Sequence, residues 1–498
     1  MQRIHELLDR AKDEAPEAQA FVDQSGLSVT WSVLDQMARE CEEEMRAEGV
    51  GVGDRVVLVF ENGVTFVARL FAASRLGAVV VPFNARLSAA DLQRVMDHCA
   101  PRLLWFSGSK AADRHAERLG AVGGIYVPDA ASKPQTLEAL SDQNDTIPPE
   151  DVAVLVYTSG TTGAAKAAML THTNLLAGSE ASAVLRGLRS DDLFFIVAPM
   201  AHVLGLVAML AVCNRRASAL IHAVFDVARL FEELQNGVTT FSGPPQMHAL
   251  LFEHAERPDT PAFSAPRLRV VASGGAPLDP DWKRKAESFY GLPMQNGYGL
   301  TETSAGVCST NSQLGDPDLS VGLAMHGSAL RIDFDRSGAE PEHGIGEICV
   351  QGPQVMLGYY RNEDETRKCL TEDGWFYTGD LGRFDDEGRL HIVGRSKALI
   401  IRSGFNVYPA EVEAALTLHP QITNSAVVGR SVPGNEEIVA FLETKENVQL
   451  SPQTIRDWLT DRLTAYKFPQ HYYFVEKLPL TSTGKVDRVA LQERAAAN

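Results

Sequence analysis

The chain has 498 residues, of which 45% are hydrophobic and 22% charged, and 64 acidic against 46 basic residues give a formal net charge of −18 at pH 7. Because a single hydrophobic core rarely serves so long a chain, we expect two or three domains, and the composition excludes disordered and fibrous classes. So acidic a surface argues against non-specific binding to nucleic acid or to an anionic membrane.

The first 125 residues alternate between helical and extended patterns. The charged start, residues 1–10, predicts an amphipathic helix rather than a signal peptide. Apolar strands that alternate with helices predict parallel sheets covered on both faces. The polar stretch 129–151 is expected to be a surface connection. The expected strands are 55–60, 77–81 (ending before Pro82) and 103–106, and the expected helices are 64–76 and 91–98.

Residues 193–212 carry no formal charge and are long enough to span a bilayer. Pro199, His202 and Gly205 interrupt the centre of this run, and an interior proline costs a helix about 3 kcal/mol. We therefore favour a buried strand, a turn that ends at His202 and a buried helix from about Leu204 over a membrane span.

From Asp151 the alternation resumes, and residues 330–385 are richer in turns and short strands, such as 345–350, which predicts a β-rich subdomain. Beyond Arg395 the pattern predicts a separate α+β unit of about 100 residues. Its expected helices start at Pro409 and cover 452–464, and its expected strands cover 424–428 and 438–443.

The six cysteines are scattered, without a C-x-x-C pair. This spacing indicates neither a disulfide framework nor a zinc site, and it favours a reducing, cytoplasmic location.

The strongest chemical signal is Tyr157-Thr-Ser-Gly-Thr-Thr-Gly-Ala-Ala-Lys166, which follows an apolar run. Its glycines let the backbone amides turn inward, its hydroxyls add donors and its lysine adds positive charge, a combination that suits a polyphosphate. The segment is not the usual P-loop, because its glycines are three residues apart and Ala167 follows the lysine. A Ser/Thr/Gly-rich turn without a ligand is the alternative. The candidate phosphate-binding residues are Thr158, Ser159, Gly160, Thr161, Thr162, Gly163 and Lys166.

Two further segments carry weaker signals. In Asn296-Gly-Tyr-Gly-Leu-Thr-Glu302 the paired glycines permit close approach of a planar ligand, and the glutamate offers the hard oxygen that magnesium prefers. Tyr377-Thr-Gly-Asp380 places a carboxylate where it could accept from the hydroxyls of a ribose, although any T-G-D turn has the same pattern.

Together with Pro199-Met-Ala-His202, Ser273-Gly-Gly-Ala-Pro277 and the segments 394–411 and 480–488, these motifs stand in the order of one family. The chain resembles the adenylate-forming superfamily of AMP-forming acyl- and aryl-CoA synthetases, from Val29 through Lys485. The resemblance implies an α/β fold with a large multi-sheet N-terminal domain, residues 1–396, that binds AMP and the acyl group. It also implies a small mobile α+β domain, residues 397–498, that carries the catalytic lysine and begins at a hinge, Lys397.

The same resemblance implies an ATP-dependent carboxylic acid–CoA ligase. The carboxylate attacks the α-phosphate of ATP to give an acyl-adenylate and pyrophosphate, and the thiol of coenzyme A then displaces AMP. Because the first step brings an anion against a polyanion, it needs Mg²⁺ and cationic side chains. Rotation of the small domain between the steps lets one site serve both reactions.

Residue roles follow from the resemblance, position by position. Lys485 would bridge the carboxylate and the α-phosphate, which Thr301 would also reach. Glu302, with Thr162, would hold the metal ion, while Asp380 and Arg395 would hold the ribose. The residues that would frame the adenine are Gly274, Gly275, Ala276, Pro277, Asn296, Gly297, Tyr298 and Gly299. Those that would line the CoA tunnel are Ser403, Gly404 and Phe405. His202 would act as a gate beside the acyl carboxylate, with a core histidine as the alternative.

Two departures from the family pattern stand out. The phosphate loop usually reads G-x-P-K-G but here is Gly163-Ala-Ala-Lys-Ala167, so Ala165 and Ala167 alter the stiffness of the loop without removing a donor side chain. Ala398 stands where the family usually carries an acid after the hinge, which bears on how the small domain docks.

The substrate is expected to be a small carboxylic acid with a neutral hydrophobic tail, either fatty or aryl. No acid near His202 is available to neutralise an amine, which disfavours amino acids, and Val203, Leu204, Leu206 and Met209 are apolar. Two alternatives stay open: transfer of the acyl group to a carrier protein or a luciferase-like fate, and a non-catalytic nucleotide-binding relative. No nucleic-acid partner and no membrane span are expected, and a homo-oligomer is left open.

Overall fold

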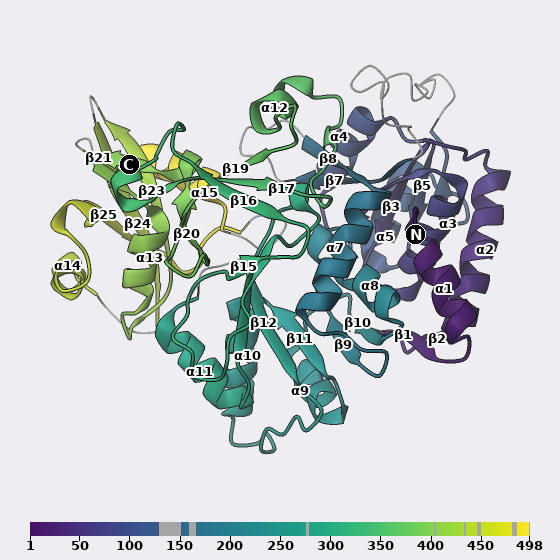
Figure 1. The fold of residues 1–498 in the computed structure, drawn as a ribbon, viewed down its shortest axis with the longest axis horizontal. Helices are drawn as coiled ribbons and strands as arrows, with labels where there is room; N and C mark the ends of the chain where they lie inside the picture. The colour runs from purple at the N-terminus through teal and green to yellow at the C-terminus, as the bar shows by residue number, and fades with distance from the viewer. Residues whose placement is uncertain are drawn as a thin grey trace. The chain divides into compact units, whose positions relative to one another are not determined.

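The computed structural model describes residues 1–128, 151–158, 166–274, 278–402, 405–432, 435–445, 450–480 and 486–497. These residues form two compact units, Met1–Ala329 with Val350–Phe376, and Leu330–Cys349 with Tyr377–Asn498 (Figure 1). The surface connection expected over 129–151 lies, apart from Asp151, outside the described residues.

The first unit contains a seven-stranded sheet in the order β18-β8-β7-β4-β3-β5-β6. Its inner strands β7, β4, β3 and β5 run parallel, and every residue of β3 is buried, as expected of a strand covered on both faces. The strands are β3 Arg55–Phe60, β4 Val79–Asn84, β5 Leu103–Phe106, β6 Ile125–Tyr126, β7 Val152–Thr158, β8 Lys166–Thr171 and β18 Gly358–Tyr359. The connecting helices are α3 Val64–Leu76, α4 Ala89–Cys99 and α5 Lys110–Leu119.

The expectation that the second strand ends before Pro82 is wrong, because β4 continues to Asn84. Its pairing with β7 is confined to Val80, so the missing amide of Pro82 costs no hydrogen bond to that neighbour.

The first unit also contains a nine-stranded sheet in the order β15-β14-β13-β12-β11-β9-β10-β1-β2. The six strands from β13 to β1 run parallel, so their carboxyl ends meet at one edge of the sheet. The strands are β1 Gln19–Asp23, β2 Ser28–Thr30, β9 Leu193–Ile196, β10 Ser218–Ile221, β11 Thr240–Gly243, β12 Val270–Gly274, β13 Met294–Tyr298, β14 Cys308–Ser309 and β15 Leu323–Ala324. The helices are α1 Glu6–Glu14, α2 Trp31–Ala47, α7 His172–Leu185, α8 Val203–Arg215, α9 Val227–Asn236, α10 Pro245–Ala255, α11 Pro280–Tyr290 and α12 Glu363–Cys369.

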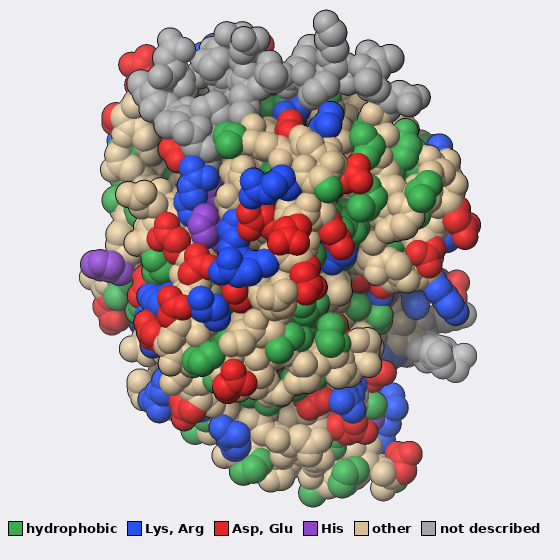
Figure 2. All heavy atoms as spheres, turned by 90° about the vertical axis from the view of Figure 1, so that its right-hand side faces the viewer, with side chains coloured by type: hydrophobic (Ala, Val, Ile, Leu, Met, Phe, Trp, Pro, Cys, Tyr) green, Lys and Arg blue, Asp and Glu red, His purple; other side chains and the backbone are tan. Residues whose placement is uncertain are grey.

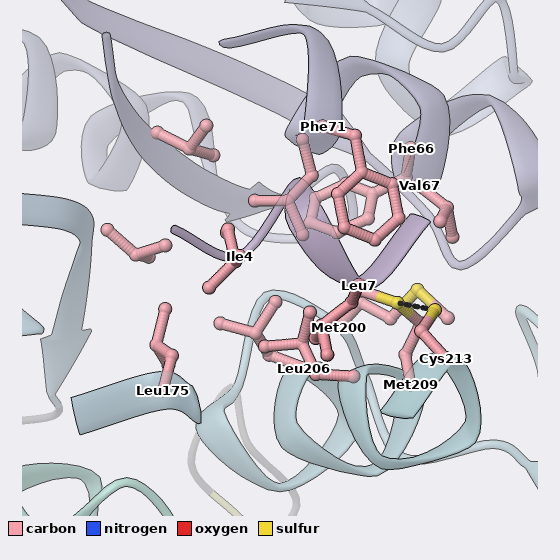
Figure 3. Packing of buried hydrophobic residues seen from close by; sticks show 14 of the residues in the cluster. Ile4, Leu7, Phe66, Val67, Phe71, Leu175, Met200, Leu206, Met209 and Cys213 are labelled. Atoms are coloured by element: carbon pink, nitrogen blue, oxygen red, sulfur yellow. Dashed lines mark hydrogen bonds between the residues drawn. The ribbon is translucent and has the colours of Figure 1, made fainter. Parts of the chain in front are cut away.

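The uncharged run 193–212 forms β9, a turn and α8, as expected, and α8 lies in the protein core. Figure 3 shows Leu206 and Met209 of this helix facing Leu7 near the N-terminus and Phe66 of α3, and all four are buried. Burial of each such side chain stabilises the fold by roughly 1.5–3 kcal/mol. Within the described ranges, no helix is both long and apolar enough to cross a bilayer.

The second unit is built from three small sheets. A four-stranded sheet has the order β16-β17-β19-β20, a hairpin joins β21 to β22, and a three-stranded sheet has the order β23-β24-β25. The strands are β16 Ala329–Asp333, β17 Gly346–Gln351, β19 Phe376–Phe384, β20 Leu390–Arg395, β21 Ile400–Arg402, β22 Phe405–Val407, β23 Ile422–Val432, β24 Asn435–Thr444 and β25 His471–Phe474. The helices are α13 Pro409–Thr417, α14 Pro452–Thr460 and α15 Arg488–Ala497.

The β-rich segment expected over 330–385 is therefore present, as are the strands and helices expected after Arg395, although α14 ends at Thr460 rather than Thr464. Lys397 lies in the short 3₁₀ helix η4, Ser396–Ala398. The division into compact units does not test whether a hinge between mobile domains lies at Lys397, so the domain boundary there stays a prediction.

All six cysteines are free thiols, and five of them are buried. On the face drawn in Figure 2, basic and acidic side chains are interspersed over the described residues. That face therefore offers no broad basic surface of the kind that binds a nucleic-acid backbone.

Candidate functional site

One tyrosine joins two residues that sequence reasoning assigned to phosphate and metal binding. Thr158 and Lys166 pair across the antiparallel strands β7 and β8. The Lys166 side chain is 12% exposed, forms an ion pair with Glu365, and its Nζ lies 5.5 Å from the ring centroid of Tyr359. The Tyr359 hydroxyl donates to Glu302 Oε1 at 2.7 Å. Lys166, the expected phosphate-binding lysine, and Glu302, the expected metal ligand, thus both contact the side chain of Tyr359.

Glu365 and Tyr359 were not identified from the sequence. Glu365 lies in the first turn of α12, where Asn362 caps the helix by accepting from the Glu365 amide at 3.2 Å. Hydrogen bonds from Lys166, and then from Lys368, lower the pKa of Glu365 to about 2, so this acid is ionised. Burial raises the pKa of Tyr359 far above its ordinary value, which keeps its hydroxyl a donor. The acidic run after Asn362 signals a helix start but does not reveal a partner 199 residues away.

Glu302 fits a magnesium ion that also binds phosphate. It lies in the 3₁₀ helix η2, Thr301–Thr303, and its backbone oxygen accepts from the Met356 amide at 2.8 Å. Mg²⁺ is commonly held by one or two carboxylates together with phosphate oxygens and water. The part of the chain that the structure describes contains no group of three or more His, Cys, Asp or Glu that could hold a metal. An ion bound at Glu302 would therefore take most of its ligands from the nucleotide and from water.

The glycines expected to frame the adenine lie at the carboxyl edge of the nine-stranded sheet, where Gly274 of β12 pairs with Gly297 of β13. They differ in the room that a side chain would find. A Cβ atom on Gly299 would lie 1.4 Å from the Ala305 oxygen, and one on Gly297 would lie 3.2 Å from the Cys308 oxygen. A Cβ atom on Gly274 would meet no protein atom nearer than 3.8 Å. Gly299 is thus required by its own loop, whereas Gly274 leaves open space.

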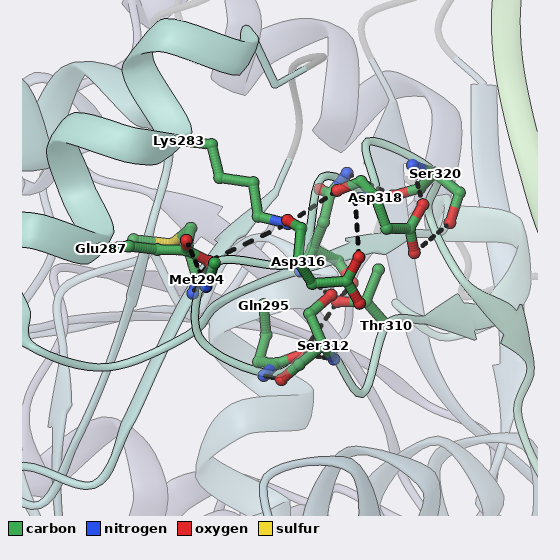
Figure 4. A network of polar contacts seen from close by, with 11 residues as sticks. Lys283, Glu287, Met294, Gln295, Thr310, Ser312, Asp316, Asp318 and Ser320 are labelled. Carbon is green, nitrogen blue, oxygen red and sulfur yellow. Dashed lines mark hydrogen bonds and ion pairs between the residues drawn. The ribbon is translucent and has the colours of Figure 1, made fainter.

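A buried polar network fixes β13 behind these glycines (Figure 4). Lys283 Nζ donates to the backbone oxygens of Asp316 and Asp318, each at 2.7 Å, and Glu287 Oε1 accepts from the Met294 amide at 3.1 Å. Because these buried charges have hydrogen-bond partners, they hold the strand without the cost of an unpaired charge. Further hydrogen bonds in the network involve Gln295, Thr310 and Ser312.

His202 stands at the same sheet edge, as the N-cap residue of α8 after β9. Its side chain is half-buried, whereas Leu204 is 47% exposed. Leu206 and Met209, which we expected to surround the acid, are instead fully buried in the core shown in Figure 3. Apolar character at these two positions reflects packing, so it says nothing about the substrate.

In the second unit, Asp380 and Arg395 are brought together as expected. They pair across β19 and β20, and Arg395 Nε donates to Asp380 Oδ1 at 2.9 Å. The aspartate side chain is 5% exposed and that of the arginine 63%. Phe405, expected to contact CoA, is 54% exposed, and its ring stacks on Tyr466 with the centroids 4.8 Å apart.

A cationic cavity of about 510 Å³ in the first unit was not anticipated. It is lined by Glu61, Arg86, Lys110, Ala111 and Arg114. Glu61 follows β3, Arg86 follows β4, and Lys110 begins α5 after β5, so the cavity lies at the carboxyl ends of three parallel strands. Because β4 and β5 lie on opposite sides of β3, these ends flank a topological switch point, where α/β sheets commonly bind ligands. Within the described residues neither Lys110 nor Arg114 forms an ion pair, so both remain available to an anion.

Several expected site residues lie outside the described residues, and their roles stay predictions. They are Ser159, Gly160, Thr161, Thr162, Gly163, Ala165, Gly275, Ala276, Pro277, Ser403, Gly404 and Lys485.

Comparison with known proteins adds a family. The model of the AMP-binding enzyme family matches residues 8–360, and that of the AMP-binding enzyme C-terminal domain matches residues 411–485. The chain is 31% identical over 490 residues to a feruloyl-CoA synthase of Amycolatopsis sp, covering 96% of each protein. It is 29% identical over 508 residues to a long-chain-fatty-acid–CoA ligase of Mycobacterium tuberculosis, covering 100% of this chain and 99% of that one. The ATP-bound structure of MatB from Rhodopseudomonas palustris matches with a TM-score of 0.84 at 30% identity, covering 99% of each chain.

Proposed function

Because the chain belongs to the AMP-binding family of adenylate-forming enzymes and is an AMP-forming acid–CoA ligase, we propose that its substrate is a fatty or aryl carboxylic acid whose tail is uncharged. The acid is activated with ATP and Mg²⁺ as an acyl-adenylate, and CoA then takes the acyl group. The relatives are named as CoA ligases, so transfer to a carrier protein and a non-catalytic role are not favoured.

The observation that carries the proposed activation with ATP is the convergence of Lys166 and Glu302 on Tyr359. A free carboxylate has no tolerable leaving group, and conversion to a mixed anhydride with AMP supplies one. The reaction brings two anions together, so it needs positive charge at the phosphates. Lys166 would supply one such charge to the β- and γ-phosphates, and the carboxylate of Glu302 would hold a magnesium ion, which would neutralise phosphate charge.

Asp380 and Arg395 support a grip on the nucleotide ribose. A carboxylate can accept hydrogen bonds from both hydroxyls of a ribose, and the ion pair with Arg395 holds the Asp380 side chain in one orientation. In the proposed mechanism Thr301 reaches the α-phosphate, Lys485 bridges that phosphate and the acid, and rotation about Lys397 exchanges the two half-reactions.

The cationic cavity supports the binding of CoA, which carries several phosphate groups. Lys110 and Arg114 provide positive charge on a chain whose net charge is −18, so they make a local attractive site for such an anion. Phe405, exposed on the second unit, offers an apolar surface for the pantetheine arm.

The choice of an acid with an uncharged tail rests on the turn at His202. No acidic residue lies between Pro199 and Leu204 to neutralise a substrate amine, and Leu204 presents an exposed apolar side chain beside the histidine. Two relatives are named for a feruloyl group and for long-chain fatty acids, which agrees with this choice, whereas a relative from Cupriavidus necator, 31% identical over 482 residues, is named for sulfoacetate, an acid with a second anionic group.

A panel of carboxylic acids tests the proposal. Each acid is supplied with ATP and Mg²⁺, with and without CoA, and pyrophosphate and AMP release are measured. We expect pyrophosphate release with fatty or aryl acids and AMP turnover only when CoA is present. Lys485→Ala should abolish formation of the acyl-adenylate while leaving much of the thioester step from supplied acyl-AMP. Preference for amino acids or diacids would overturn the substrate class, and equal loss of both steps would overturn the role of Lys485.

A further inference from the structure

The turn that carries Asp380 is held on both sides of a single residue, Gly379. Gly379 lies within β19 but has a φ of +74°, a left-handed conformation that interrupts the regular strand. Its amide donates to Glu347 Oε1 at 2.9 Å, and its carbonyl oxygen accepts from Ser396 Oγ at 3.0 Å. Glu347 belongs to the adjacent strand β17, so a side chain replaces the backbone partner that the strand would otherwise supply.

A hydroxyl fixes the amide of the following residue, Asp380. Thr378 Oγ1 donates to the Ile348 backbone oxygen at 2.9 Å and accepts from the Asp380 amide at 3.0 Å. The amides of Gly379 and Asp380 are therefore both bound by side chains, one from Glu347 and one from Thr378. These contacts determine the direction in which the Asp380 carboxylate leaves the strand.

Glu347 is an unusual choice for a structural acceptor. It is only 8% exposed, and burial raises the pKa of its carboxyl; the hydrogen bond from Gly379 and the charge of Arg336 partly offset this rise, and Asp333 and Asp380 add to it. A buried carboxylate near another carboxylate is costly, and a neutral acceptor would bind a backbone amide at lower cost. Its hydrogen bond to the Gly379 amide points to a role in setting the turn that carries Asp380.

We propose that Glu347 is a positioning residue for nucleotide recognition, which holds the Gly379 peptide so that Asp380 faces the two hydroxyls of the ribose. The inference rests on the proposed function, specifically on the binding of the ribose by Asp380. Glu347 itself touches neither nucleotide nor acid in this mechanism. Its effect therefore falls on ribose recognition and leaves the phosphate groups untouched.

Nucleotide binding separates this role from general support of the fold. Isothermal titration calorimetry gives dissociation constants for ATP and for 2′,3′-dideoxy-ATP, both with Mg²⁺, and no acid is required. In the native protein ATP should bind more tightly than the dideoxy analogue, because only ATP offers hydroxyls to Asp380. Glu347→Met removes the acceptor at similar size, and we expect it to weaken ATP binding by roughly tenfold and dideoxy-ATP binding by less than about twofold. Glu347→Gln keeps an oxygen acceptor and should preserve the native preference for ATP.

Two further variants define the controls. Asp380→Asn should lower the preference for ATP directly. Glu443→Met removes another glutamate that accepts one backbone amide, from Leu478 at 2.6 Å, and it should leave the preference unchanged. If Glu347→Met does not fold, Ser396→Ala, which releases the carbonyl oxygen of Gly379, should reduce the preference in the same direction.

The outcomes are distinguishable. Loss of preference in Asp380→Asn and Glu347→Met, with recovery in Glu347→Gln, supports the inference. Equal weakening of both nucleotides by Glu347→Met, or no weakening, overturns it while leaving Asp380 in its role. An unchanged preference in Asp380→Asn overturns the ribose assignment of the proposed function, and the inference falls with it.

Discussion

Three glycines at the expected adenine site allow a graded test, because the structure gives each a different tolerance for a methyl group. A Cβ atom on Gly299 would lie 1.4 Å from the Ala305 oxygen, whereas nonbonded carbon and oxygen atoms prefer about 3.5 Å. Gly299→Ala must therefore displace the backbone by about 2 Å. Since a displacement of even 1 Å can cost about 100-fold in rate, we expect kcat/KM for ATP to fall at least about 100-fold.

The other two substitutions are milder and act by different routes. A Cβ atom on Gly297 would lie 3.2 Å from the Cys308 oxygen, so a shift of a few tenths of an ångström accommodates it, and we expect a loss within about tenfold. Gly274→Ala meets no protein atom nearer than 3.8 Å, so thermal stability should hardly change. Any loss of ATP affinity in Gly274→Ala then reports contact with the ligand itself.

Calorimetric titration with ATP and thermal unfolding of each variant provide the measurements. The reasoning requires the order Gly299→Ala, then Gly297→Ala, in loss of ATP binding, and it requires that Gly274→Ala weakens ATP without lowering the melting temperature. Native ATP affinity in Gly299→Ala would show that this loop does not bind nucleotide. Native affinity in Gly274→Ala would show that the adenine does not approach β12.

Three further predictions concern charge. Glu365→Gln removes the acid that competes with phosphate for Lys166. We expect ATP to bind up to about fivefold more tightly, because a partly exposed ion pair contributes at most about 1 kcal/mol. Weaker binding of ATP would mean that Glu365 positions the lysine instead. Burial lowers the pKa of His248 to about 4 from an ordinary value of 6.5, so the neutral form stabilises the fold above pH 6.5 and that stability is lost as the pH falls towards 4. Between pH 7 and 5 this amounts to a loss of about 2 kcal/mol of unfolding free energy. Urea titrations should show that His248→Gln lacks this loss. If the unfolding free energy of His248→Gln depends on pH as in the native protein, His248 is not its source. Arg114→Glu should raise KM for CoA roughly fivefold at low salt and leave KM for ATP unchanged, and insensitivity of KM for CoA would exclude the cavity as its site.

Local patterns were sufficient where structure depends on neighbours in sequence. The strand Arg55–Phe60 and the helix Val64–Leu76 have the predicted bounds, because an apolar run and a helical period are both visible within a few residues. The continuation of the second strand through Pro82 was not predicted. Whether a strand accepts a proline depends on which neighbouring strand pairs at that position, and this pairing is a property of the sheet rather than of the local sequence.

The candidate site was predictable as a set of motifs but not as an arrangement. From the sequence, Lys166, Glu302 and Asp380 were predicted to bind phosphate, metal and ribose, and these roles stay predictions. Their partners were not predicted, because Glu365 is 199 residues from Lys166 and Glu347 is 32 residues from Gly379, and neither belongs to a phosphate-, metal- or ribose-binding motif of the sequence. Apolar residues of α8 were misread for a related reason, since a sequence does not tell a pocket wall from a core-facing side chain.

The burial of α8 limits where the choice of acid can change. Leu206 is fully buried, and its replacement by alanine would lower the free energy of unfolding by about 2–5 kcal/mol. Leu204, the second residue of the helix, is 47% exposed, so its replacement should cost little stability. If the acid binds beside His202, as proposed, substitutions in the first turn of this helix should change the acid preference with little loss of stability, whereas substitutions in its later turns would destabilise the fold.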